Sequence, residues 1–126
     1  MQSLLFDTDV IIDHLRGYQP ATHYLLEKKS NSLFVSAITV SELFSGIKTT
    51  EEQNNAESIL QLLQTIPVDH EIAVIGGRFR KEYKNSHGTG LMDALIAATA
   101  LHHEATLITL NTRHFPMVKT IKPYDK

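Results

Sequence analysis

Short apolar runs alternate with longer stretches of helical periodicity along this chain. The runs at residues 3–6, 33–36 and 105–110 are typical of buried strands, and weaker runs at 66–68 and 118–121 predict two more. Apolar positions recurring every three or four residues predict helices over residues 7–15, 21–29, 39–47, 52–63, 69–83 and 91–103. Strands that alternate with helices indicate an α/β domain with a mainly parallel central sheet flanked by helices.

Two of the predicted helices have unusual compositions. Residues 91–103 are nearly all apolar, so we expect that helix to be buried. The helix over 69–83 contains Gly76 and Gly77, each costing about 1 kcal/mol relative to Ala, which close packing of a neighbouring backbone would explain. A polar loop is expected over residues 85–90.

Composition narrows the possibilities without naming a function. The 126 residues, 42% hydrophobic and 21% charged, suit one domain over residues 1–126, with no linker or repeat. The absence of cysteine excludes disulfides and thiolate metal sites. No run approaches the roughly 20 apolar residues of a membrane span, and Asp7 and Asp9 interrupt the first run too early for a signal peptide. We therefore expect a cytoplasmic protein with no membrane partner.

Three acidic residues lie in sequence contexts that call for an explanation of their charge. Asp93 lies in the most apolar helix, Asp7 ends a predicted buried strand, and Glu42 shares a helix face with small or polar residues. Taken singly, helix capping explains Asp7 and Asp93, and solvent exposure explains Glu42. Sites in parallel sheets form beyond the carboxyl ends of the strands, where Asp7 and Asn111 are expected.

If the three acids converge, their mutual repulsion raises their pKa values unless a cation is present. A hard divalent ion such as Mg²⁺ prefers oxygen ligands, and such ions activate water and stabilise phosphoryl displacement. The pattern therefore favours metal-dependent phosphoryl chemistry.

Basic residues gather in one segment although the formal net charge is −2, which counts mildly against a nucleic-acid partner. A solvent-exposed helix face would explain them, and so would a rim that contacts RNA phosphates beside Asp93. The candidates for RNA contact are Arg78, Arg80, Lys81 and Lys84, together with Arg113 near the C-terminus.

Four segments together resemble the PIN-domain family, and within it the VapC-type toxins of toxin–antitoxin pairs. They are residues 5–13 (LFDTDVIID), 35–46 (VSAITVSELFSG), 93–100 (DALIAATA) and 109–115 (TLNTRHF). The resemblance implies a three-layer PIN-like fold and a ribonuclease that hydrolyses RNA phosphodiester bonds.

The same resemblance assigns roles to particular residues. It implies that Asp7, Glu42 and Asp93 are catalytic and bind Mg²⁺ or Mn²⁺, and that Thr8 and Asp9 support them. The fourth acidic position falls on Asn111, a neutral residue, which leaves one negative charge fewer and puts a second metal in doubt. A VapB-type antitoxin that covers the site and a homodimer are also implied.

Two alternatives remain open at this point. Residues 7–11 (DTDVI) resemble the nucleophile motif of haloacid-dehalogenase-type phosphatases, although Ile11 departs from it and no well-placed lysine follows. A catalytically inert PIN-like module that binds RNA or protein is the other, and the neutral Asn111 permits it.

Overall fold

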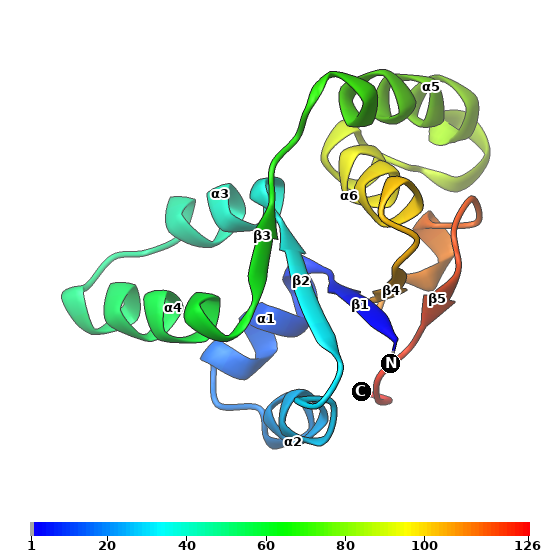
Figure 1. Cartoon of the computed structure of the whole chain (residues 1–126). Helices are drawn as coiled ribbons and strands as arrows, with labels where there is room; N and C mark the ends of the chain where they lie inside the picture. Colours follow the sequence, from blue (N-terminus) through cyan, green and yellow to red (C-terminus); the bar gives the residue numbers. More distant parts are fainter. Residues whose placement is uncertain (1) are drawn as a thin grey trace.

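A computed structural model describes residues 2–126, and these residues build a five-stranded sheet with helices on both faces (Figure 1). The strands are β1 (Ser3–Phe6), β2 (Ser32–Ser36), β3 (Gln64–Ile66), β4 (Thr106–Ile108) and β5 (Thr120–Ile121). Their order is β3-β2-β1-β4-β5, and every pairing is parallel. The predicted α/β class is confirmed, and the sheet is wholly parallel.

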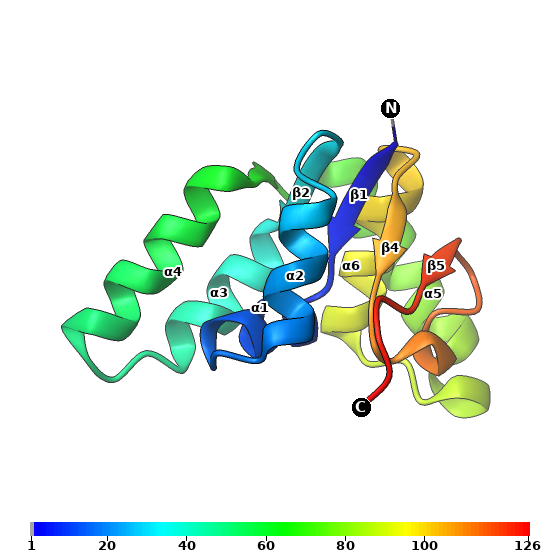
Figure 2. The ribbon, with the colours of Figure 1, turned by 90° about the horizontal axis from the view of Figure 1, so that it is seen from below.

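The two sheet faces are covered by different helices, which gives three layers (Figure 2). The helices are α1 (Thr8–Leu15), α2 (Gln19–Glu27), α3 (Ala37–Ser45), α4 (Thr50–Leu62), α5 (His70–His87) and α6 (Leu91–His102). Leu4 and Phe6 of β1 pack with α1, α2 and α4, whereas Leu5 packs with α5 and α6. This alternation follows from the two-residue period of a strand, and it explains why β1 is apolar throughout.

Local signals set the helix ends. Asp7, Ser36, Thr49 and Asp69 each cap a helix through a side-chain oxygen, and Thr49 forms a capping box with Glu52. These caps supply acceptors for amide groups that have no partner within the helix.

Several predicted boundaries are wrong. The helix expected at residue 39 begins at Ala37, because Ser36 caps it, and the helix expected at residue 21 begins at Gln19, because Pro20 suits a first turn. Residues 85–87 belong to α5 rather than to a loop, and Gly88 ends that helix with a left-handed φ of 66°. The strand expected over 105–110 covers only Thr106–Ile108.

The helix α6 is only partly buried, which corrects the expectation of full burial. Its central residues Ile96–Ala100 are covered by the sheet and α5, whereas Leu91, Met92 and Leu101 are about half exposed. Gly76 lets α5 approach α6, since a Cβ there would lie 2.6 Å from Leu95 Cδ2, whereas a Cβ at Gly77 would meet nothing within 4 Å. Close packing therefore explains Gly76 alone. Across residues 2–126, no helix is long and apolar enough to cross a membrane.

Candidate active site

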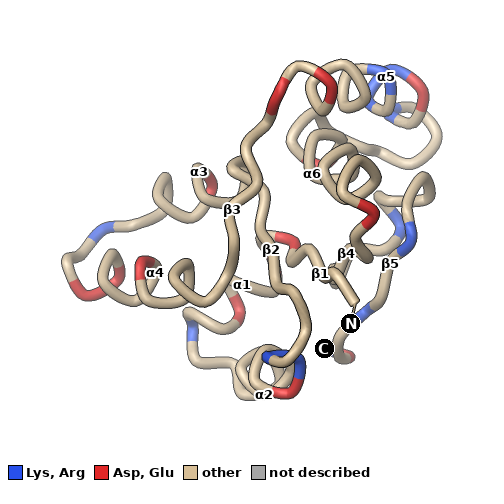
Figure 3. Tube along the Cα trace, viewed as in Figure 1, with Lys and Arg blue, Asp and Glu red and all other residues tan. Residues whose placement is uncertain are grey.

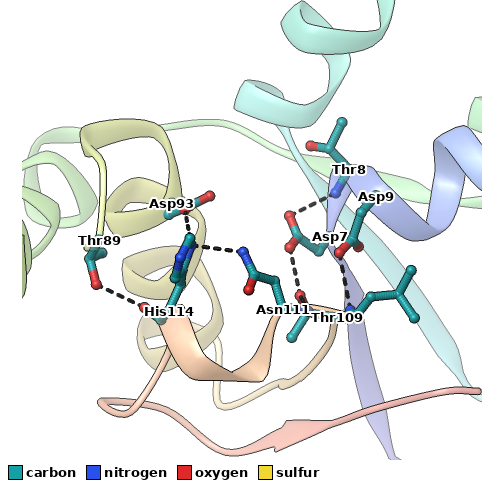
Figure 4. A network of polar contacts seen from close by, with 9 residues as sticks. Asp7, Thr8, Asp9, Thr89, Asp93, Thr109, Asn111 and His114 are labelled. Carbon is teal, nitrogen blue, oxygen red and sulfur yellow. Dashed lines mark hydrogen bonds and ion pairs between the residues drawn. The ribbon is translucent and has the colours of Figure 1, made fainter. Parts of the chain in front are cut away.

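Asp7 lies at the carboxyl end of the central strand β1 and caps α1. Its backbone N–H donates to the carbonyl of Ile108 at 2.9 Å, which extends the pairing with β4 by one residue. Its Oδ1 accepts a hydrogen bond from the Thr8 amide at 2.8 Å, and its Oδ2 accepts one from Thr109 Oγ1 at 2.7 Å (Figure 4). The carboxylate is therefore fixed in place by two strands and a helix start.

Burial raises the pKa of Asp7 to about 7. The negative charges of Asp9 and Asp93 act in the same direction, whereas the hydrogen bonds from Thr109 and Thr8 partly oppose the rise. Protonation of the Asp7 carboxylate, or a cation beside it, would reduce the electrostatic cost of burying its charge.

Asp9 joins the start of α1 to the segment after β4. Its Oδ2 accepts a hydrogen bond from the Leu110 amide at 3.1 Å, whereas its Oδ1 is buried without a hydrogen-bond partner within residues 2–126. Burial raises the pKa of this carboxyl, and the charge of Asp13 adds to the effect. A buried carboxylate oxygen without a donor is costly, which makes Asp9 a second acid that a cation would stabilise.

Thr8 links Glu42 to the start of α1. Its hydroxyl donates to Glu42 Oε1 at 2.5 Å and accepts from the buried Thr39 hydroxyl, whose oxygen lies 2.9 Å away. Thr39 and Glu42 are one turn apart on α3, so the two helices meet at this polar contact. A hollow of about 180 Å³ between α1, α3 and α4 includes Glu42 and Arg16 in its lining.

Asp93 lies in the first turn of α6 and faces His114 (Figure 4). The His114 Nδ1 atom lies 3.2 Å from Asp93 Oδ2 and 2.7 Å from the Asn111 side-chain nitrogen. The Thr89 hydroxyl donates to the His114 carbonyl at 2.9 Å, which ties the turn before α6 to the 3₁₀ turn Thr112–His114. The side chains of Asp93 and His114 are each 32% exposed, so both are accessible from solvent.

The structure thus gathers the predicted acids in one region but joins them pairwise. The charge of Asp93 acts on Asp7, and Glu42 contacts Thr8, whose amide donates to Asp7. In the part of the chain that the structure describes, no three His, Asp or Glu side chains already form a metal-binding group. Asn111 contacts His114 and Thr109 rather than the acids themselves.

Sequence reasoning missed Thr109 and His114 as site residues. Both lie in the segment 109–115 that carries the resemblance, directly after a buried strand. Their polarity at that position was the available signal, but their partners Asp7 and Asp93 are distant in sequence, so no local spacing rule connects them.

The predicted basic residues differ in position and exposure. Arg78, Lys81 and Lys84 are exposed along α5, and Figure 3 shows their charges gathered on that helix. Arg80 is half-buried, and its Nε has no hydrogen-bond partner among the described residues. Arg113 is exposed and directly precedes His114, which contacts Asp93.

Comparisons with known proteins identify the family of the chain. The family model of the PIN domain matches residues 4–119. Two relatives from Mycobacterium tuberculosis, named Ribonuclease VapC10 and Ribonuclease VapC19, are each 38% identical; the alignments cover 95% and 94% of this chain and 91% and 97% of theirs.

The fold is also similar to solved structures. A toxin–antitoxin complex from Klebsiella pneumoniae contains a chain with a TM-score of 0.83 and 32% identity, covering 98% of this chain and 99% of that one. FitAcB from Neisseria gonorrhoeae gives a TM-score of 0.76 at 30% identity, with 95% and 97% covered. The four-segment resemblance is confirmed, and the chain belongs to the PIN-domain family.

Proposed function

We propose that this protein is a metal-dependent endoribonuclease that hydrolyses RNA phosphodiester bonds and is the toxin of a toxin–antitoxin pair. The observation that carries the proposal is the position of three acids at the carboxyl end of a parallel sheet. Asp7 caps α1, Asp93 lies in the first turn of α6 and acts electrostatically on Asp7, and Glu42 of α3 accepts a hydrogen bond from Thr8. The ribonuclease names of the two mycobacterial relatives support the same activity.

Mg²⁺ or Mn²⁺ is the proposed cofactor. Three observations support this cofactor: the acids offer oxygen ligands, burial raises the pKa values of Asp7 and Asp9, and Asp9 Oδ1 is a buried oxygen without a donor in residues 2–126. Asp7, Glu42 and Asp93 would hold the ion. When bound, such an ion activates water as the nucleophile and stabilises charge on the phosphoryl oxygens.

The protein's own residues hold the acids and the substrate in position. Thr109 and the Thr8 amide orient Asp7, and the Thr8 hydroxyl orients Glu42. Arg113, exposed next to His114, is proposed to contact an RNA phosphate near the acids. The basic residues of α5 are proposed to contact the RNA backbone farther from the acids, which strengthens binding without selecting a sequence.

RNA cleavage by the purified protein tests the activity. Wild-type protein with Mg²⁺ or Mn²⁺ should cleave a labelled RNA, and Asp7→Asn or Asp93→Asn should reduce the rate at least about 100-fold while remaining folded. Glu82→Gln, which changes an exposed acid on α5, is the matched control and should retain activity. Undiminished cleavage by both folded Asp variants would overturn the proposal.

Calorimetric titration of Mn²⁺ into partner-free protein tests the cofactor separately. Wild-type protein should bind Mn²⁺, and Asp93→Asn should abolish or strongly weaken binding because one carboxylate charge is lost. A folded wild-type protein that binds neither Mn²⁺ nor Mg²⁺, alone or with RNA present, would favour an inert RNA- or protein-binding module.

A VapB-type antitoxin is the proposed protein partner, since the Klebsiella pneumoniae structure is a toxin–antitoxin complex. Co-purification with the product of a neighbouring antitoxin gene, and inhibition of RNA cleavage by it, would test this partner. The homodimer stays a prediction that light scattering can check. Because RNA is the proposed substrate, we expect the protein in the cytoplasm. Fractionation of cells that express the protein tests that location.

A further inference from the structure

The His114 ring is held firmly at the site. His114 is the last residue of the 3₁₀ turn, its carbonyl accepts a hydrogen bond from the Thr89 hydroxyl, and the next residue, Phe115, is only 1% exposed. A Cβ at Gly88 would lie 3.9 Å from His114 Nε2, so that edge of the ring faces the turn before α6. The other ring nitrogen, Nδ1, therefore faces Asp93 and Asn111 (Figure 4).

The surroundings of Nδ1 cannot all be satisfied by hydrogen bonds. A ring nitrogen presents either one N–H or one lone pair. An N–H suits Asp93 but faces the Asn111 amino group, whereas a lone pair accepts from Asn111 but faces a carboxylate oxygen 3.2 Å away. Turning the Asn111 amide over makes two oxygens compete for one N–H. A cation bound by the lone pairs of Nδ1 and Asp93 Oδ2 would satisfy both atoms, provided that the Asn111 side chain turns away from Nδ1.

The spacing of the two atoms also suits a shared cation. Two neighbouring ligands of an octahedral ion with bonds of about 2.1 Å lie about 3 Å apart. The 3.2 Å between His114 Nδ1 and Asp93 Oδ2 is close to that separation. Both side chains are one-third exposed, so an ion can reach them without unfolding of the site.

We propose that His114 is a nitrogen ligand of the metal that Asp93 binds, and that it biases the site toward first-row transition ions over Mg²⁺. The inference rests on the metal-dependent function proposed above and places the fourth ligand at His114 rather than at Asn111. Imidazole nitrogen binds transition ions well, whereas Mg²⁺ prefers oxygen ligands alone. The Asn111 side chain, which lies 2.7 Å from the same nitrogen, would give up that contact to the ion.

Pulsed electron paramagnetic resonance of the Mn²⁺-loaded protein tests the ligand directly. The ¹⁴N coupling of a coordinated imidazole should be present in the wild type and absent in His114→Asp, which replaces the nitrogen by oxygen. His87→Asp is the matched control, because its ring contacts Ser86 rather than an acid, and it should keep the coupling. Bound Mn²⁺ without ¹⁴N coupling in the wild type would overturn the inference.

Ion selectivity provides a second readout that does not depend on activity. We expect His114→Asp to lower the ratio of Mn²⁺ affinity to Mg²⁺ affinity by about tenfold or more, and His114→Ala to weaken Mn²⁺ binding. Thermal unfolding of each variant excludes misfolding as the cause. An unchanged ratio in folded His114→Asp protein would contradict the role of His114.

Asp93→Asn separates the two proposals. Mn²⁺ binding that depends on Asp93 but shows no nitrogen signal rejects the His114 ligand and leaves the metal-dependent function standing. Absence of Mn²⁺ binding by folded wild-type protein, with or without RNA, rejects both.

Discussion

Asp7 ionises only at a cost to the free energy of folding, because burial raises its pKa from 3.8 to about 7. The unfolded chain releases this proton first, so the folded state binds more protons between those two values. Stability of the metal-free protein should therefore fall as pH rises from about 4 to about 7. The loss approaches about 4 kcal/mol at most, at roughly 1.4 kcal/mol per pKa unit.

Asp7→Asn should abolish most of that pH dependence. The amide oxygen can still accept from the Thr8 amide, and the amide nitrogen can donate to Thr109 Oγ1, so the substitution preserves the contacts. Denaturant titrations in chelator at pH 5 and pH 8 should show the variant more stable than wild type at pH 8 by on the order of 2–3 kcal/mol. Equal stability at pH 8 would contradict the electrostatic cost assigned to Asp7.

Thr109 should contribute to stability and to metal binding because its hydroxyl makes hydrogen bonds with two groups. It donates to Asp7 Oδ2 and accepts from the Asn111 amide, and Thr109 is fully buried. Thr109→Val keeps the shape but leaves both partners unsatisfied, so we expect a stability loss of about 1–3 kcal/mol and weaker Mn²⁺ binding. Thr106→Val, a buried threonine of β4 that lies away from the acids, is the control and should cost less; equal losses would contradict this role.

The residue types of the site were predictable, but their contacts were not. Asp7 and Asp93 stood out because carboxylates in apolar segments are costly, and the structure places them within electrostatic reach of each other. His114 escaped notice because its partner Asp93 precedes it by a helix and a strand. Such pairings depend on tertiary packing, which hydrophobic periodicity does not encode.

At the scale of helices and strands, periodicity predicted which elements exist, whereas side-chain caps and backbone angles decided their ends. Ser36 begins α3 two residues before the apolar stripe would place it, because its hydroxyl accepts a hydrogen bond from the Ile38 amide. The polar residues at the end of α5 resembled a loop, yet they continue the helix until Gly88 adopts a left-handed conformation. Composition alone does not distinguish an exposed last turn from a loop.

The two adjacent glycines of α5 should respond oppositely to the same substitution. Gly76→Ala places a Cβ 3.3 Å from Leu95 Cα and 2.6 Å from its Cδ2, so we expect a destabilisation of about 1–3 kcal/mol. Gly77→Ala meets no atom within 4 Å and should stabilise the helix by up to about 1 kcal/mol. Thermal and denaturant unfolding of both variants measure the difference. Destabilisation by both would show that α5 needs glycine for flexibility rather than for close packing against α6.

At the scale of the molecule, the parallel sheet explains why residues distant in sequence form one site. Every strand pairing is parallel, so the segments that follow β1, β2 and β4 all leave the sheet at the carboxyl end of its strands. Asp7, Glu42 and His114 all follow such strand ends. Strand order was not predictable from periodicity, but the rule that sites form at carboxyl ends placed Asp7 correctly without it.

The C-terminal residues fasten the end of the chain to the helix that carries the first acids. Tyr124 donates to Asp13 Oδ2 at 2.8 Å, and Lys126 contacts Asp13 Oδ1 at 3.0 Å. Asp13 is only 6% exposed and lies one helical turn after Asp9 on α1. The buried carboxylate therefore relies on donors from the last residues of the sequence.

Tyr124→Phe should lower the free energy of unfolding by about 1–3 kcal/mol, because it removes a donor from a buried carboxylate oxygen. Lys126→Met should cost less, about 0–1 kcal/mol, since the lysine is half exposed and water screens its charge. Tyr83→Phe is the control, because its ring packs on Phe79 while its hydroxyl makes no hydrogen bond within residues 2–126. Denaturant unfolding ranks the three variants, and an equal effect of Tyr83→Phe and Tyr124→Phe would mean that ring packing, rather than the bond to Asp13, secures the C-terminus. Mn²⁺ titration of the Tyr124→Phe protein then measures whether the lost contact at Asp13 also affects Asp9 and Asp7. Weaker Mn²⁺ binding would show that it does, and unchanged binding would show that the effect stays within that helical turn.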